Sequence, residues 1–210
     1  MPLSIHTLIL GPMENNTFIL GDADARDAVV IDPSFNDGLI QKETKKFDLE
    51  IKAIWLTHAH FDHYAGASSL SKSYNPPLPI SLHIDDLSLW RRGGGAREFG
   101  IDVDQEIEPK IYLKHKEILY VGKQEVEVRH TPGHSPGHIV FYVKDIGTVF
   151  CGDLIFRRGI GRTDLPGGDY QTLITSIKTQ IFSLPSETRL LCGHGPETTV
   201  AQETTLNPFL

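Results

Sequence analysis

The feature that most constrains this chain is the stretch Thr-His-Ala-His-Phe-Asp-His at residues 57–63. It directly follows the apolar run Ile-Lys-Ala-Ile-Trp-Leu at residues 51–56, which predicts a β-strand. Imidazole and carboxylate groups are ligands that zinc, iron and manganese all accept in proteins. Three imidazoles and one carboxylate, placed where the chain leaves a sheet, therefore predict a metal-binding loop.

Two local conformations of this loop are open. In a helix, His58 and Asp62 would share one face at positions i and i+4, and His60 and His63 would share another at i and i+3. In a loop that opens into a helix, His58 and His60 would hold one ion, and Asp62 and His63 would point to a second. We prefer the second arrangement because it accommodates two ions.

Length, composition and charge limit the class of protein. At 210 residues, 40% of them hydrophobic, the chain is long enough for one substantial core, and we predict a single domain over residues 1–210. Its formal net charge of -7 argues against nucleic acid or an anionic membrane as a partner, because phosphate binding depends on clustered Lys and Arg. No apolar run approaches the roughly 20 residues that span a bilayer, and no secretory signal pattern is present, so we expect a cytoplasmic protein.

The two cysteines, Cys151 and Cys192, each lie within an apolar run. Free cysteine behaves as a small apolar side chain, and disulfides are rare in cytoplasmic proteins. We therefore expect two core residues rather than a disulfide.

Period-two apolar patterns and turn residues predict strands in both halves of the chain. The expected strands are residues 4–10, 17–20, 28–33, 51–56 and 79–83, and then 117–121, 124–130, 138–143, 147–151 and 188–192. Helices are expected at residues 36–47, 64–74 and 84–90, and after Asp169, which can cap a helix with an apolar stripe of Leu173, Ile174, Ile177 and Ile181. Strands followed by helices in both halves predict two sheets packed face to face with helices outside.

The three glycines at residues 93–95 end the helix predicted before them, because consecutive glycines raise the entropic cost of helix formation. This segment is either a mobile lid over a site or a plain connector, and both interpretations are open.

Three further ligand candidates, His134, Asp153 and His194, follow predicted strands in the second half, each next to a glycine. Taken singly, a histidine or aspartate at a strand end is more typical of a turn or a hydrogen-bonding residue. Together with the cluster at residues 58–63, they indicate side chains that converge from separate strand ends on one metal centre, where glycine permits close approach of the backbone.

In type and order, these residues resemble the signature of the metallo-β-lactamase fold hydrolases, which is His-x-His-x-Asp-His followed by an isolated His, Asp and His. All seven positions are present, namely His58, His60, Asp62, His63, His134, Asp153 and His194. Within that superfamily, residues 161–170 and the Asn-Pro-Phe-Leu sequence at residues 207–210 resemble the small glyoxalase II-like hydrolases.

The resemblance implies an α+β protein, an αββα sandwich of two mixed sheets with helices outside and a binuclear site at one edge. His58, His60 and His134 would hold one ion, Asp62, His63 and His194 the other, and Asp153 would bridge the two. Two divalent metal ions per chain are expected, with zinc preferred and iron or manganese as alternatives that the same ligands accept. Asp62 and Asp153 would be the catalytic carboxylates, beside a bridging hydroxide that acts as the nucleophile.

The implied reaction is hydrolysis of a small-molecule thioester such as S-2-hydroxyacylglutathione, whose thiolate is a fair leaving group that needs no strong general acid. The alternative is a glutathione persulfide dioxygenase, which would use a single non-haem iron held by two histidines and an aspartate. The continuation Leu-Pro-Gly-Gly-Asp-Tyr at residues 165–170 favours the hydrolase.

Arg162 matches a position where related enzymes place a basic residue that holds glutathione, so it is the expected substrate-binding residue, with a surface salt bridge as its other interpretation. Gly-Pro at residues 195–196 stands where larger glyoxalase II enzymes place a tyrosine that contacts glutathione, so the thiol carrier and the acyl group stay open. His130 and His138 flank His134 and are expected to be structural. No oligomeric state is predicted.

Overall fold

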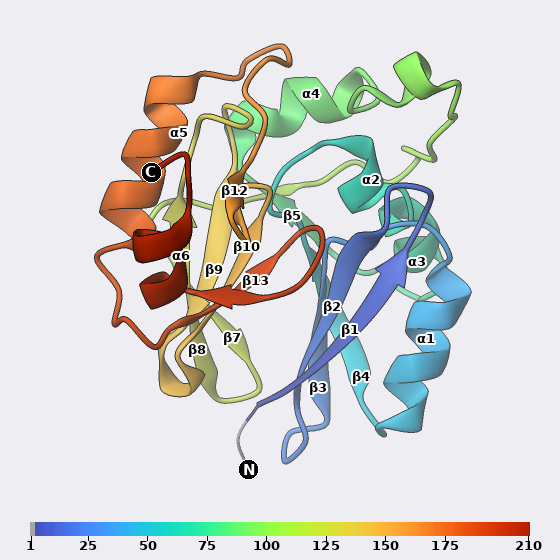
Figure 1. Cartoon of the computed structure of the whole chain (residues 1–210). Coiled ribbons are helices and arrows are strands. Elements are labelled where there is room, and N and C mark those ends of the chain that lie inside the picture. The colour runs from blue at the N-terminus through green and yellow to red at the C-terminus, as the bar shows by residue number, and fades with distance from the viewer. Residues whose placement is uncertain (1–2) are drawn as a thin grey trace.

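The first sheet is formed by the first half of the chain. In the computed structural model, which describes residues 3–210, its strands are β1 (Ser4–Leu10), β2 (Asn15–Asp22), β3 (Asp27–Ile31), β4 (Glu50–Trp55), β5 (Ile80–Leu82) and β6 (Ile111–Tyr112). They lie side by side in that order (Figure 1). The first three strands are antiparallel, whereas β3 to β6 are parallel, so the sheet is mixed.

The second sheet is formed by the second half of the chain. Its strands are β7 (Ile118–Val121), β8 (Gln124–His130), β9 (Ile139–Val143), β10 (Thr148–Gly152), β13 (Arg189–Cys192) and β14 (Thr198–Thr199). The spatial order is β14-β13-β10-β9-β8-β7, and β10 and β13 pair in parallel within an otherwise antiparallel sheet. The short strands β11 (Ile155–Phe156) and β12 (Gly159–Ile160) form a separate antiparallel pair.

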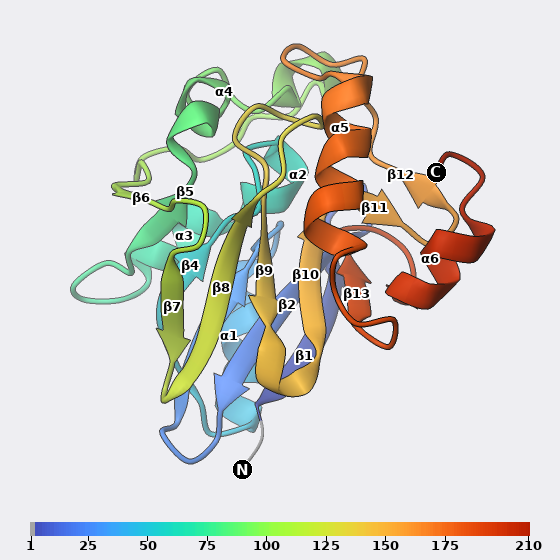
Figure 2. The ribbon, with the colours of Figure 1, turned by 90° about the vertical axis from the view of Figure 1, so that its left-hand side faces the viewer.

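Helices cover the outer sides of both sheets. The α-helices are α1 (Asp37–Lys46), α2 (Phe61–Tyr64), α3 (Ala67–Lys72), α4 (Leu87–Arg91), α5 (Tyr170–Ser176) and α6 (Val200–Leu206). The shorter 3-10 helical turns are η1 (Ile84–Asp86), η2 (Ala96–Phe99) and η3 (Lys144–Ile146). A π-helical segment, η4 (Ile177–Ile181), continues α5. Figure 1 shows α1 and α3 outside the first sheet and α5 and α6 outside the second, and Figure 2 shows α5 lying along the outer face of the second sheet.

Alternating apolar residues give each sheet two buried faces. On β2, Phe18 and Leu20 pack in the cluster between the sheets, whereas Ile19 packs in the cluster that also contains residues of α1 and α3. On β9, Phe141 packs between the sheets, and Val140 packs with the apolar stripe of α5 and η4. The three clusters are the interfaces of an αββα sandwich, which confirms the predicted α+β fold class.

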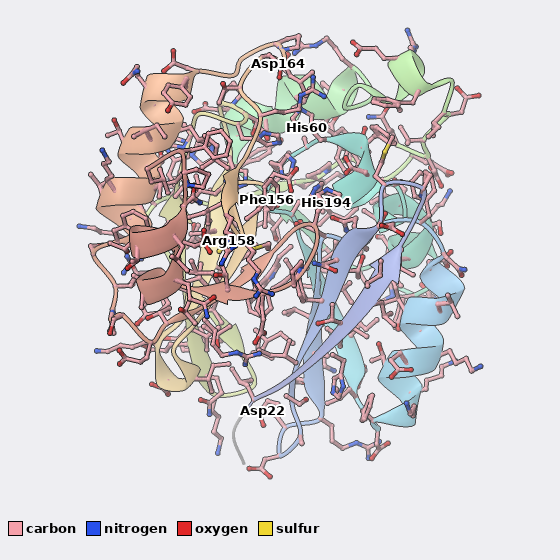
Figure 3. The ribbon with its side chains drawn as sticks, in the orientation of Figure 1. Asp22, His60, Phe156, Arg158, Asp164 and His194 are labelled. Carbon is pink, nitrogen blue, oxygen red and sulfur yellow. The ribbon has the colours of Figure 1, made fainter. Side chains whose placement is uncertain are left out.

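The strands that precede the ligand candidates end at one edge of the sandwich. β8 and β10 run in the same direction, because β9 between them is antiparallel to both. β13 is parallel to β10, so it runs in that direction as well. The residues that follow these three strands include His134, Asp153 and His194. In Figure 3, the labelled His60 and His194 both lie in the upper part of the molecule, where strands of the two sheets end.

Most predicted elements are present, with small shifts at their ends. The helix predicted over residues 64–74 is wrong in its extent, because α2 already begins at Phe61 and is separated from α3 at Gly66, whose N–H donates to the carbonyl of Pro33. Strands β6, β11, β12 and β14 and helix α6 were not predicted. Cys151 and Cys192 are buried and unpaired, as expected. Between residues 3 and 210, no helix has the length and apolar character needed to cross a membrane.

Candidate metal centre

The loop after β4 opens into a helix, which agrees with the preferred one of the two predicted conformations. His60 directly precedes α2 and has an extended backbone, with φ -75 and ψ 142 degrees, so Asp62 and His63 lie in the first turn of that helix. His58 lies in the non-helical part of the loop. The fully helical alternative is therefore wrong.

The first group of side chains that could hold a metal ion, called here the first ligand group, consists of His58, His60 and His134. Their ring nitrogens all lie within 4.8 Å of one another. His60 Nδ1 lies 2.8 Å from His134 Nε2. Burial lowers the pKa of His60 to about 3 and holds the pKa of His58 well below its ordinary value. Both imidazoles are therefore neutral at physiological pH, which is the form that binds a metal ion.

The second ligand group consists of Asp62, His63 and His194, whose ligand atoms meet the same 4.8 Å limit. Asp62 Oδ2 lies 3.1 Å from His194 Nε2 and 3.6 Å from His63 Nε2. His63 is fully buried, whereas His194 is partly exposed, so this group lies nearer to the surface. Helix α2 supplies two of its members, and the end of β13 supplies the third.

Asp153 lies between the two groups. Its Oδ1 is 3.3 Å from His63 Nε2 and 3.7 Å from His194 Nε2, and its Oδ2 is 3.7 Å from His134 Nε2. Burial by itself raises the pKa of Asp153, but the neighbouring charge of His63 outweighs it and holds the pKa well below the ordinary value. The backbone N–H of Asp153 donates to His138 Nε2 at 3.1 Å, so His138 positions Asp153 and belongs to neither ligand group.

Buried polar atoms in this cluster fit a bound cation. His58 Nε2, His63 Nε2 and Asp153 Oδ1 are buried and have no hydrogen-bond partner among the described residues. An unsatisfied buried polar atom ordinarily costs about 1–3 kcal/mol, and three of them at one point are explained if each faces a metal ion. The nitrogen and oxygen donors suit zinc, iron and manganese alike.

Close backbone packing around Asp153 requires a glycine at position 161. A Cβ atom on Gly161 would lie 1.8 Å from the carbonyl oxygen of Asp153 and 3.3 Å from His134 Nδ1. Sequence analysis expected such close backbone approach at the glycines next to the ligand candidates. Gly161 is a different glycine with the same property. Gly161 lies directly after β12, so the β11 and β12 pair brings it back to the end of β10.

Residues 13–16, which we call the N-terminal clamp, hold the segment around His194. His194 Nδ1 lies 2.9 Å from the carbonyl oxygen of Met13, and Asn15 forms an isolated β-bridge with His194. The backbone N–H of Asn16 donates to the carbonyl of Gly193 at 2.7 Å, and its side-chain amide donates to Cys192 and Gly195 carbonyls. This clamp links the first sheet to the second at the metal centre.

Two buried carboxylates that sequence analysis missed hold the ligand loops. Asp32 accepts hydrogen bonds from the N–H and hydroxyl of Thr57, each at 2.7 Å, and lies 2.9 Å from His63 Nδ1. Asp86 accepts from Ala59 N at 2.9 Å, from Ser135 Oγ at 2.7 Å and from Gly137 N at 2.6 Å, so it connects the loop of His58 and His60 to the loop of His134. Asp32 is a charged residue near the end of the apolar strand predicted over residues 28–33, which is a sequence signal. Asp86 shows no such signal.

A second cluster of possible ligands does not have the geometry of a metal site. His83, Asp85 and His130 offer atoms within 4.8 Å of one another. The rings of His83 and His130, however, are stacked with their centroids 4.1 Å apart and their planes 10° apart. The nitrogen lone pairs then lie in nearly parallel planes and do not converge on one ion.

A cavity of about 800 Å³ opens onto the exposed side of the metal centre. His60, Asp62, His134, Asp153 and His194 form its floor. Its walls are mostly apolar and come from Met13, Phe61, Leu89, Phe99, Leu165 and Pro166. The charged residues on the walls are Arg92, Arg97, Glu98 and Arg162.

Arg162 lines this cavity, where sequence analysis expects a substrate-binding residue. Its guanidinium donates to both carboxylate oxygens of Asp164, at 2.8 and 2.7 Å, so the salt-bridge interpretation also describes its side chain. Its backbone carbonyl lies 2.8 Å from His134 Nδ1 and orients that ring. Orienting contacts of this kind fix the tautomer of a ligating histidine.

Comparison with known proteins agrees with this geometry. A family model of the metallo-beta-lactamase superfamily matches residues 10–194. The chain is 34% identical to hydroxyacylglutathione hydrolase GloC of Haemophilus influenzae, covering 99% of this chain and 98% of that protein. Among solved structures, it is similar to BLEG-1 B3 metallo-beta-lactamase, with 35% identity, a TM-score of 0.89 and coverage of 99% of both chains. It is also similar to TTHA1623 in a di-iron-bound form, with 37% identity, a TM-score of 0.87 and coverage of 98% and 100%.

Proposed function

Because the chain belongs to the metallo-β-lactamase superfamily, we propose that it is a binuclear metal-dependent hydrolase that cleaves thioesters such as S-2-hydroxyacylglutathione. The observation that carries this proposal is the pair of ligand groups that share Asp153 and open onto one cavity. The similarity to GloC supports the thioester, and the di-iron form of TTHA1623 supports two ions.

In this proposal each ligand group holds one ion. His58, His60 and His134 would bind the first, Asp62, His63 and His194 would bind the second, and Asp153, which lies between the two groups, would be a shared ligand. Two divalent ions, for which zinc is the first candidate, would lower the pKa of water toward neutrality and polarise the substrate carbonyl.

The protein's own contribution is to hold ionised carboxylates and to surround the substrate. Burial raises the pKa of Asp62, but the charge of His63 and the hydrogen bond from His194 outweigh it and leave the pKa below its ordinary value. Asp62 is therefore an acceptor at neutral pH, and it can orient an attacking water beside the ligand groups. Apolar walls limit water around the substrate, and a thiolate leaves without a strong general acid.

Arg162 stays a proposed contact to the substrate, because it lines the cavity. Its charge is already paired with Asp164, so an amide group of the substrate is its expected partner. A cytoplasmic location is supported by the two buried, unpaired cysteines, since disulfides are rare in that compartment.

The test is metal content and stoichiometry of the purified protein, measured together with S-lactoylglutathione cleavage and oxygen uptake. Two ions per chain with thioester cleavage is the expected result. One iron per chain with oxygen uptake on glutathione persulfide would contradict it and favour the dioxygenase alternative. Nitrocefin, a chromogenic β-lactam, is assayed in parallel because BLEG-1 is a B3 metallo-beta-lactamase, and faster turnover of nitrocefin would contradict the thioester.

A matched pair of variants links activity to the metal centre. Asp153→Asn removes a charge that faces both ligand groups and should reduce metal occupancy and abolish thioester cleavage. Asp145→Asn changes an exposed carboxylate on η3 and should leave both quantities as in the wild type.

A further inference from the structure

One wall of the cavity is formed by residues 92–100 and is attached to the metal loop. The N–H of Phe61 donates to the carbonyl of Gly94 at 3.1 Å. Gly94 has a φ of +58 degrees, and a Cβ atom there would lie 2.5 Å from the carbonyl oxygen of Ala59, so only glycine fits. Ala96, at the start of η2, is 1% exposed. The segment is therefore a fixed wall, and these contacts argue against a lid that opens at the glycines.

The arginines around the cavity differ in whether their charge is already paired. Arg162 is held by both oxygens of Asp164, which raises its pKa, and the charge of Glu98 contributes in the same direction. A guanidinium with two carboxylates nearby has little uncompensated charge to offer a substrate.

Arg97 has no such partner. Arg97 is an exposed residue that lines the cavity, and its guanidinium forms no hydrogen bond or ion pair with any residue between positions 3 and 210. The guanidinium of Arg92, on the same wall, donates to the neutral hydroxyl of Ser88 and to no other residue that the structure describes. These two cations therefore face the cavity with their charge unpaired, in a chain whose net charge is -7.

We propose that Arg97 selects substrates that carry a carboxylate, and that Arg92 is a second contact to the same anion. A guanidinium binds a carboxylate with two parallel hydrogen bonds, a geometry that neutral side chains do not match. This proposal rests on the hydrolase function above and deepens it. The thiol carrier is anionic, and its carboxylate is bound by arginines of residues 92–100 rather than by Arg162.

The aromatic residue beside Arg97 defines the other half of the substrate. Phe99 is 54% exposed, and its ring centroid lies 5.3 Å from that of Phe61, another residue of the cavity wall. An apolar group that packs on this pair would bury surface that water now covers. The substrate class is therefore a thioester that joins an apolar segment to a carboxylate.

The experiment uses a ligand that cannot be hydrolysed, so that binding is measured apart from activity. Isothermal titration of the metal-loaded protein gives the Kd of S-hexylglutathione and of its diethyl ester, in which the carboxylates are masked. The quantity compared is the ratio of the two Kd values for the wild type, Arg97→Gln, Arg162→Gln and Arg26→Gln. Arg26 is a matched control, because it is exposed and pairs with Asp48 away from the cavity.

The wild type should prefer the acid over the diester, and Arg97→Gln should reduce that preference about tenfold, the effect of one charge-assisted hydrogen bond. Arg26→Gln should leave the preference unchanged, and Arg162→Gln should reduce it less than Arg97→Gln does. A variant that loses apolar contacts or folds poorly would bind the acid and the diester more weakly by the same factor. The ratio of the two Kd values would then stay unchanged.

Equal binding of acid and diester by the wild type, no binding of the acid, or an unchanged ratio in Arg97→Gln would each overturn the proposal. A larger effect from Arg162→Gln would overturn it as well. If the ratio falls as expected while the wild type cleaves no thioester, the carboxylate contact stands and the hydrolase function fails, so the two failures are distinguishable.

Discussion

Replacement of Asp86 by asparagine should weaken both folding and metal binding, although Asp86 belongs to neither ligand group. Its carboxylate accepts hydrogen bonds from Ala59, Ser135 and Gly137 and connects two ligand loops. Asparagine keeps the shape but has one acceptor oxygen, so the N–H of Ala59 or of Gly137 must face an amide NH₂ group. The variant therefore places a donor against a buried donor.

The expected loss in the free energy of unfolding follows from this single contact between two donors. A buried donor that loses its acceptor costs about 1–3 kcal/mol. Burial also raises the pKa of Asp86, which shows that its charge is itself disfavoured in the fold, and asparagine removes that penalty. We therefore expect the free energy of unfolding to fall by about 1–2 kcal/mol, the lower part of that range. Metal affinity should fall by about 10- to 100-fold, as for other groups that orient ligands.

The assays are urea unfolding of the metal-free protein and zinc competition against a chromophoric chelator. Asp85→Asn is the matched control, because Asp85 is exposed and its carboxylate makes no hydrogen bond to either ligand loop. Its free energy of unfolding should stay within about 0.5 kcal/mol of the wild type. If Asp86→Asn matches Asp85→Asn in both assays, the reasoning that Asp86 holds the ligand loops is refuted.

Two further predictions concern packing and thiol reactivity. Gly161→Ala should lower the free energy of unfolding by about 1–3 kcal/mol and reduce metal occupancy, because its Cβ would overlap the carbonyl of Asp153. The control Gly159→Ala should change neither quantity, because the nearest atom to the added Cβ is 3.6 Å away. Equal effects of the two substitutions would contradict this prediction. The native protein should resist labelling by a thiol reagent until guanidinium is added, because burial raises the pKa of Cys192 to about 12 and that of Cys151 well above its ordinary value. Rapid labelling of the native protein would show that the two thiols are accessible and would contradict this prediction.

The strands and the candidate ligand positions were predictable because their signals are local. β2 and β9 alternate apolar side chains between two cores, and that alternation appears in the sequence as a period of two. The loop at residues 57–63 needed no tertiary information, since four candidate ligand residues lie within six positions of the chain. Helix α6 was also within reach, because Thr199 accepts from Gln202 N and the two residues form a Thr-x-x-Gln capping pattern.

What could not be predicted depends on contacts between distant segments. β6 and β11 contain two residues each, too few to show any period. Asp86 acts through backbone groups of residues 59 and 137, so its own neighbours in sequence carry no sign of its role. The unpaired state of Arg97 is likewise a property of the folded cavity and not of the motif.

The N-terminal clamp has a consequence for biosynthesis. Met13 and His194 are 181 positions apart in sequence, and the clamp segment leaves the ribosome long before its partner strand exists. A nascent chain that ends before β13 can already assemble the trio of His58, His60 and His134, but it lacks one member of the other trio. If each trio holds an ion, as proposed, the first ion could be captured during translation, whereas the second could bind only after almost the entire polypeptide has emerged.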